Sequence, residues 1–155
     1  MLKTHGMPFF INVILPLPLE NHFTYSISEA EAIFLKPGMR VAVPFGRSKV
    51  YTGIVSEVHQ NDPKIYEAKP IEQILDEKPV ITEIQLQFWS WIANYYMCAE
   101  GEVMRAALPG ALLLESETLI QLSPTREIDE TELNDQEYLI YEALKTQSSL
   151  RIQEV

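Results

Sequence analysis

The sequence is poor in cysteine, in long apolar runs and in positive charge, and each shortage excludes a class of protein. Cys98 is the only cysteine among 155 residues, so an intramolecular disulfide is impossible and a cysteine-based metal cage lacks ligands. No stretch approaches the ~18 uninterrupted apolar residues that a membrane span needs. The first residues are not a convincing signal peptide, because Asn12 and two prolines interrupt their apolar run. We therefore expect no membrane contact and a reducing, cytoplasmic location.

Positive charge is scarce and unevenly distributed. Twelve Lys and Arg residues stand against 22 Asp and Glu residues, which gives a net charge of −10 and should repel nucleic-acid phosphates. Residues 1–80 hold eight basic and nine acidic side chains, whereas residues 81–155 hold four and thirteen. Between Lys36 and Lys69, six basic residues outnumber three acidic ones. Two interpretations of this charge distribution stay open: a local basic face in the first half, or an acidic surface without a nucleic-acid partner.

Motifs for catalysis and cofactor binding are missing as well. The sequence has no Gly-x-x-x-x-Gly-Lys-Ser/Thr, Gly-x-Gly-x-x-Gly, His-Glu-x-x-His or Gly-x-Ser-x-Gly pattern. His5, His22 and His59 are isolated, which favours ordinary surface or half-buried histidines over metal ligands. We expect no catalytic residue, no metal site, no cofactor and no enzymatic activity in these residues.

The first half of the chain shows the alternation of β-strands. The expected strands are Phe9–Leu15, His22–Ile27, Arg40–Phe45 and Tyr51–Val58, with a closing strand within 69–76. Several short strands with turns between them predict a small β-barrel, of which the OB-like type is one form. Gly53 inside the fourth strand predicts a bulge, a bend or a close backbone approach.

Two helices are expected next. Thr82 and Gln85 fit a capping box, and Ile81 with Leu86 fits a hydrophobic staple, so a helix should begin there and end near Met97. Apolar residues at helical spacing predict its buried face: Ile84, Phe88, Trp91, Ile92 and Tyr95. Stacking of its aromatic residues on bases is the alternative. A shorter helix is expected over Gly101–Leu108.

The last part of the chain predicts a strand and two helices. We expect a strand within Glu115–Ser123, an acidic linker over Glu127–Glu132, and a helix from an Asp135 N-cap through Lys145. Leu150–Val155 has the pattern of a further helix, so we interpret the chain as a fragment of a longer protein.

Two aromatic residues indicate a candidate binding site. Phe23 and Tyr25 follow a proline-rich turn, and their strand could lie near the Pro44-Phe45-Gly46 turn. An aromatic ring can cover a base, and a glycine lets a nucleotide approach the backbone. Core packing of the same residues is the alternative.

A series of landmarks gives the chain a family resemblance. In order along residues 8–110 they are Val13–Leu19, Phe23-Thr24-Tyr25, Pro37–Gly46, Gly53-Ile54-Val55, Lys69-Pro70-Ile71, Ile74-Leu75-Asp76, Pro79, Trp91–Tyr96, Gly101 and Ala107-Leu108-Pro109. Together they resemble the start of the PriA family of primosomal replication-restart helicases. The remaining residues resemble, more loosely, the first part of that family's winged-helix domain.

The resemblance implies an α+β, mainly β fold. A 3′-DNA-end-binding domain would occupy residues 1–110, with an OB-like barrel to about 78 and a helical part over 79–110. A truncated winged-helix domain would follow at 111–155. The expected role is to hold the 3′ end of the nascent leading strand at stalled or repaired bacterial replication forks, beside primosome proteins. The ATP-dependent 3′–5′ helicase portion, with ATP, magnesium and zinc, would lie outside this sequence.

By the same resemblance, the DNA 3′-end pocket comprises Phe23, Thr24, Tyr25, Gly46 and Lys69. The two aromatic residues would shape it, Gly46 would permit close approach, and Lys69 would contact the phosphate or ribose. Thr24 departs from the family's aspartate; its hydroxyl can still hydrogen-bond, without the charge. Arg47 and Lys49 are auxiliary candidates. The alternative is an acidic β-barrel module that binds a basic protein, and it gains if the basic residues do not gather around Phe23 and Tyr25.

Overall fold

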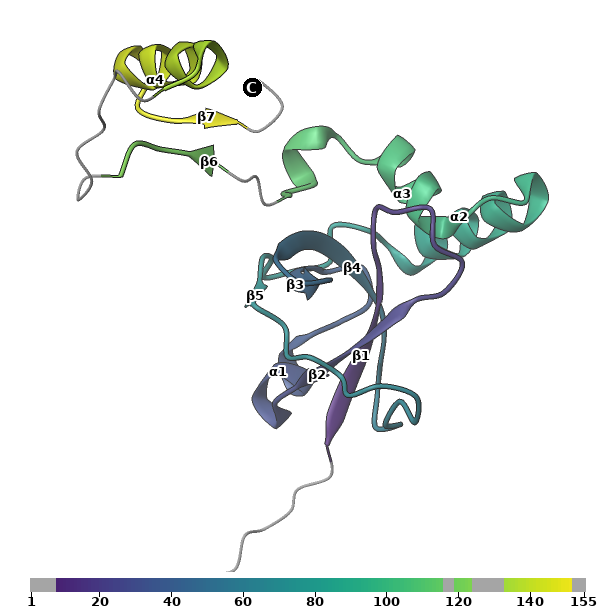
Figure 1. Ribbon diagram of the computed structural model, residues 1–155. Coiled ribbons are helices and arrows are strands. Elements are labelled where there is room, and N and C mark those ends of the chain that lie inside the picture. Colours follow the sequence, from purple (N-terminus) through teal and green to yellow (C-terminus); the bar gives the residue numbers. More distant parts are fainter. Residues whose placement is uncertain (1–7, 116–118, 124–132, 152–155) are drawn as a thin grey trace, which may run out of the picture. The chain divides into compact units, whose positions relative to one another are not determined.

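The chain forms two compact units, 1–116 and 117–155. The computed structural model describes residues 8–115, 119–123 and 133–151. The first unit has an α+β fold, in which a five-stranded antiparallel sheet is followed by helices (Figure 1). None of the helices in the described ranges combines the length and the apolar character needed to cross a membrane.

The sheet is built from the strands that the alternation predicts. They are β1 (Phe9–Ile14), β2 (Phe23–Ile27), β3 (Arg40–Phe45), β4 (Lys49–His59) and the two-residue β5 (Gln73–Ile74). Their order is β2-β1-β4-β3-β5, and every neighbouring pair is antiparallel. The first four agree with the expected spans to within two residues at each end.

The expected barrel is not closed, which corrects the prediction from sequence. β2 and β5 are the two edges of an open sheet, and β2 meets the segment before β5 in an isolated bridge between Ser26 and Pro70. Ser26 N donates to Lys69 O at 2.9 Å, and this contact is a single bridge and not a pair of strands. The segment from Lys69 therefore does not extend the edge of β2 and pairs with β3 only at Gln73–Ile74.

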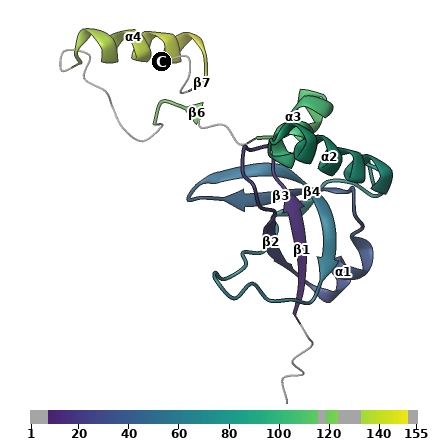
Figure 2. The same ribbon diagram turned by 90° about the vertical axis from the view of Figure 1, so that its right-hand side faces the viewer.

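Both faces of the sheet are buried near the end of β1. Val13 and Val55 belong to one apolar cluster, whereas their neighbours Ile14 and Ile54 belong to another that includes helical residues. Alternation along a strand explains how adjacent residues reach opposite faces. In both ribbon views the helices of the first unit that follow the sheet lie by the end of β1, and α1 (Glu29–Phe34) lies at the opposite end (Figures 1 and 2).

Helix α1 was not expected, although its sequence carries a signal. Ser28 is the N-cap, and its hydroxyl accepts from Glu31 N while the Glu31 carboxylate accepts from Ser28 N. This is the capping box that Ser-x-x-Glu predicts. Only six residues long, the helix offers too little periodicity to be noticed otherwise.

Helix α2 (Glu83–Tyr96) begins at the predicted Thr82 cap but buries a different face. Trp89 and Ala93 are buried, with Leu86 and Ile92 partly buried beside them. The expected face is instead mostly exposed: Ile84, Phe88, Trp91 and Tyr95 are 56–78% exposed. Apolar residues surround the helix, so the 3.6-residue period alone does not select the buried side.

Close backbone approaches fix two further contacts. Helix α3 (Glu100–Ala107) packs against the chain between β1 and β2, where a Cβ on Gly101 would lie 2.1 Å from Leu15 O. A Cβ on Gly53 would lie 2.1 Å from Val13 Cγ1, so the close approach predicted for that glycine is confirmed. A 3₁₀ turn, η1 (Gly110–Leu112), follows α3.

The second unit contains an antiparallel strand pair and a helix. β6 (Leu119–Ile120) pairs with β7 (Leu150–Arg151), and α4 (Asp135–Thr146) lies between them in sequence. Its N-cap is Asn134 and not Asp135, because the Asn134 side chain accepts from the N–H groups of Gln136 and Glu137. The helix expected from Leu150 is wrong at 150–151, which pair as a strand. The linker at 127–132 and residues 152–155 fall outside the described residues.

Candidate functional site

A cavity of about 240 Å³ lies at the open edge of the sheet. Three segments far apart in sequence form it: β2, the end of β3 with its turn, and the stretch before β5. Its lining is Phe23, Thr24, Tyr25, Pro44, Phe45, Gly46, Tyr66, Glu67 and Lys69. All five residues of the predicted pocket are therefore brought together around one hollow.

The aromatic residues of β2 form one wall of this cavity. Tyr25 is 4% exposed, and its hydroxyl donates to Pro44 O at 3.0 Å. Burial first, and nearby Tyr66 second, raise the pKa of Tyr25 to about 12, so the hydroxyl keeps its proton near neutral pH. Phe23 is half-buried and packs edge-to-face against Phe45, with ring centroids 5.2 Å apart. Tyr25 is therefore the fixed part of this wall, and Phe23 presents more exposed surface to the cavity.

Thr24 uses its hydroxyl within the protein. Its Oγ1 donates to Asn12 Oδ1 at 2.8 Å on the neighbouring strand, and Asn12 Nδ2 donates to Glu57 Oε2 at 3.3 Å. The hydroxyl oxygen can still accept a hydrogen bond. Thr24 N donates to Tyr66 Oη at 3.0 Å. Thr24 is therefore held by a hydrogen-bond chain that runs through Asn12 and ends on the Glu57 carboxylate.

Gly46 and Lys69 form the opposite side. Gly46 has a φ of +66°, in the left-handed region that favours glycine, and a Cβ there would meet no atom within 4 Å. Lys69 Nζ donates to Gly46 O at 2.9 Å. The ammonium group is thereby held beside the cavity while two of its three N–H donors are left for a ligand.

The other basic candidates are placed differently. Arg47 is exposed and adjoins Gly46 in the turn, but it does not line the cavity. Lys49 Nζ lies 3.5 Å from Tyr51 Oη and 3.8 Å from Glu115 Oε1. Of the six basic residues between 36 and 69, Lys69 is the one that lines the cavity, and Glu67 brings a negative charge to the same lining.

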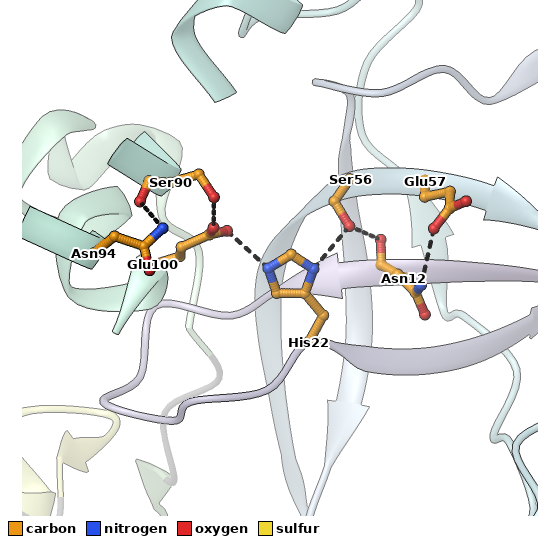
Figure 3. A network of polar contacts seen from close by, with 7 residues as sticks. All are labelled: Asn12, His22, Ser56, Glu57, Ser90, Asn94 and Glu100. Atoms are coloured by element: carbon orange, nitrogen blue, oxygen red, sulfur yellow. Dashed lines mark hydrogen bonds and ion pairs between the residues drawn. The ribbon is translucent and has the colours of Figure 1, made fainter. Parts of the chain in front are cut away.

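A polar network behind β2 positions the start of that strand (Figure 3). His22 Nε2 donates to Glu100 Oε2 at 2.7 Å, and His22 Nδ1 lies 3.1 Å from Ser56 Oγ. Ser56 is the extra residue where the β1–β4 register shifts, and its Oγ donates to Asn12 O at 3.0 Å. Glu100 also accepts from Ser90 in α2. The network therefore ties the residue before Phe23 to the sheet and to both helices.

The same network lowers the pKa of Glu100. The hydrogen bond from His22 is the largest cause; burial opposes it, and the Ser90 hydroxyl adds to it.

His22 was expected to be an isolated histidine, and its partner lies 78 positions away in sequence. Asn12 carried a clearer signal, because a polar residue inside an apolar strand needs a polar partner. Among the described residues, no group of three or more His, Cys, Asp and Glu side chains could hold a metal ion.

Comparison with known proteins identifies the family. Residues 12–109, more than half of the chain, match the 3′ DNA-binding domain (3′BD) of PriA. Replication restart protein PriA of Buchnera aphidicola subsp. Acyrthosiphon pisum is 29% identical over 130 residues, which cover 80% of this chain and 17% of that protein.

Two further relatives have the same description. PriA of Haemophilus influenzae is 35% identical over 99 residues, covering 64% of this chain and 13% of that protein. PriA of Bacillus subtilis is 29% identical over 117 residues, covering 74% of this chain and 14% of that protein. The chain spans only 13–17% of these bacterial relatives. It is a distant homologue of the N-terminal region of replication restart protein PriA, and it belongs to the family of PriA 3′ DNA-binding domains.

Proposed function

We propose that the chain holds the free 3′ end of a DNA strand in the cavity at the edge of its sheet. It would serve as the DNA-binding part of a replication-restart helicase and bind the nascent leading strand at stalled or repaired forks. Unwinding driven by ATP would belong to the remaining length of such a protein. The observation that carries the proposal is that Phe23, Thr24, Tyr25, Gly46 and Lys69 line one cavity although the first and the last lie 46 positions apart in the sequence.

The shape and chemistry of the cavity suit one terminal nucleotide. At about 240 Å³ it is slightly smaller than ordinary small-molecule sites. Phe23 offers a surface for stacking, the space beside Gly46 admits a close approach, and Lys69 supplies donors to a phosphate. Such contacts carry little sequence information. Recognition would therefore depend on the strand end and not on its bases.

Substitution of Gly46 tests this arrangement. The Cβ in Gly46→Ala would project into open space, so the protein's own packing does not oppose it, although the positive φ costs about 1 kcal/mol. A nucleotide that approaches the backbone there would meet the new methyl group. We expect Gly46→Ala to weaken binding to single-stranded DNA with a free 3′ end at least tenfold in fluorescence anisotropy.

Gly110→Ala is the matched control, because a Cβ at Gly110 also meets nothing within 4 Å and this glycine lies in η1, outside the cavity lining. It should bind as the parent does. Phe23→Ala should lose affinity like Gly46→Ala. If Gly46→Ala and Gly110→Ala bound the 3′ end equally well, DNA would not enter the cavity beside Gly46.

Two structural assignments belong to the same proposal. The open sheet of the first unit would represent the OB-like type, since its five antiparallel strands are followed by helices. The second unit would be the beginning of a winged-helix domain. Its helix and antiparallel strand pair are elements that a winged helix combines, and Leu144 and Leu150 give it buried apolar contacts.

Binding of a basic protein is a second candidate function, and one observation favours it. Phe88, Trp91 and Tyr95 form an exposed ladder along α2, with centroids 5.9 and 5.2 Å apart and near-parallel rings. Helix α2 contains Glu83 and no Lys or Arg, so it lacks the charge that draws in phosphates. Exposed aromatic patches are typical of protein contacts. Trp91→Ala should then leave 3′-end affinity unchanged, whereas a loss equal to that of Phe23→Ala would place this ladder on the DNA path.

A further inference from the structure

Two outward N–H groups of the edge strand β2 both donate hydrogen bonds to the segment 66–69. Ser26 N donates to Lys69 O at 2.9 Å, and Thr24 N donates to Tyr66 Oη at 3.0 Å. The first bond joins two main chains and fixes the path of the segment along the edge. The second uses a side chain, and it holds the Tyr66 ring against the cavity.

The Tyr66 ring is held in place by its hydroxyl but is not buried. It is 46% exposed, and the preceding Ile65 is 95% exposed, so this stretch contributes little to the apolar core. The ring nevertheless lines the same hollow as Phe23 and Phe45. An aromatic side chain that is tethered through its polar tip and keeps much of its surface open has the properties of a stacking platform.

We propose that Tyr66 is a further binding residue of the 3′-end site, whose ring, positioned by the Thr24 main chain, stacks on the base of the terminal nucleotide. This inference rests on the proposed function. Stacking on a ring is tolerant of base identity because every base has a π-face. Tyr66 would thus add affinity for any terminal base, and more for the larger purines.

A cycle that combines protein and DNA changes tests the contact. Anisotropy titrations would compare single-stranded DNA ending in a 3′ adenosine with the same strand ending in a 3′ abasic nucleotide. Tyr66→Ala should weaken binding of the adenosine end about tenfold and leave the abasic end unchanged. Tyr66→Phe keeps the ring and loses the tether to Thr24, so it should stay within about threefold of the parent.

Two other variants guard against indirect effects. Ile65→Ala removes the exposed apolar neighbour, which does not line the cavity, and should change neither end. Tyr66→Leu keeps an apolar side chain without a π-face, so it should weaken binding of the adenosine end alone, and it replaces Tyr66→Ala in the test if that variant folds poorly. Equal weakening of both DNA ends by Tyr66→Leu, or no weakening of either, would overturn the inference.

The parent chain separates this inference from the function on which it rests. Equal affinity of the parent for a free 3′ hydroxyl and a 3′ phosphate would refute end recognition itself. A clear preference for the hydroxyl end, together with no coupling between Tyr66 and the terminal base, would refute only the role of Tyr66.

Discussion

Breaking the ion pair between Arg40 and Asp76 should strongly destabilise the first unit. Three donors of Arg40 reach the Asp76 carboxylate: the main-chain N at 2.9 Å, Nε at 3.0 and 3.2 Å, and Nη2 at 2.7 Å. Arg40 Nη1 also donates to Leu112 O at 3.1 Å. The pair therefore connects the start of β3, the residues after β5 and the turn η1.

The cost of removing Asp76 follows from this geometry. The two side chains are only 14% and 9% exposed, so Asp76→Ala would leave a guanidinium group nearly out of water with Leu112 O as its remaining hydrogen-bond partner among the described residues. Breaking one side of a buried pair costs about 3–5 kcal/mol. Because some water still reaches both groups, we expect a loss of about 3 kcal/mol in the free energy of unfolding.

The pair should also make stability depend on pH. Burial acts to raise the pKa of Asp76, but hydrogen bonds from the Arg40 side chain and main chain outweigh it and hold that pKa below its ordinary value. A carboxylate with a lowered pKa in the folded state stabilises the protein above its unfolded pKa of 3.8. That stabilisation is lost as the pH falls below this value, through the folded pKa.

Urea denaturation at neutral pH measures the effect. The exposed pair of Lys49 and Glu115, 3.8 Å apart with side chains 60% and 47% exposed, gives the control: Glu115→Ala should cost less than about 0.5 kcal/mol. Replacing both buried partners together, as Arg40→Met with Asp76→Leu, should recover most of the loss. If Asp76→Ala cost no more than Glu115→Ala, solvent would screen the pair and our account of this contact would be wrong.

Three further outcomes are expected. Gly101→Ala should destabilise the first unit by at least about 2 kcal/mol in urea denaturation, because the new Cβ would lie 2.1 Å from Leu15 O, a backbone atom that cannot rotate away. A urea midpoint equal to that of the wild type would contradict this close packing. Glu100→Gln should reduce the loss of stability as the pH falls below about 4.5, because the pKa of Glu100 is held below that ordinary value and its stabilising contribution disappears as the pH falls through the folded pKa. An unchanged pH profile would show that the His22 bond does not stabilise the fold. Lys69→Ala should weaken DNA-end binding and reduce the slope of log affinity against log salt by about 0.7, and an unchanged slope would mean that Lys69 does not meet a phosphate.

Local patterns predicted most of the elements of the first unit. Alternation placed Val41 and Val43 on the buried side of β3, and both are fully buried. The Thr82 capping box placed the start of α2 correctly. These features depend on near neighbours in sequence, which is why sequence alone determines them.

Features that depend on distant residues could not be predicted in this way. The predicted barrel is not closed, because β2 meets the segment before β5 only in the isolated bridge at Ser26 and Pro70, and β5 is only two residues long. The predicted buried side of α2 was wrong, because the side that is buried depends on the residues that Trp89 packs against, and these come from other elements of the fold. Each of these outcomes requires the packing of the whole unit.

The candidate site was predicted through resemblance more than through physical pattern. Phe23 and Tyr25 alone did not distinguish a pocket from a core, and Tyr25 indeed reaches into the core while it lines the cavity. Tyr66 gave no signal, because its bond to Thr24 N depends on the path of the segment along the sheet edge. His22 and Glu100 likewise meet only after α3 has packed beside β1.

Recognition of a free 3′ end is tested most directly by fluorescence anisotropy with two single-stranded DNAs that differ only in a 3′ hydroxyl or a 3′ phosphate. A cavity of about 240 Å³ with Glu67 and the Gly46 carbonyl at its side has little room for an added dianionic group. We predict at least tenfold tighter binding of the hydroxyl end, and loss of that preference in Gly46→Ala but not in Gly110→Ala. Equal binding of both DNAs by the parent chain would contradict end recognition by this cavity.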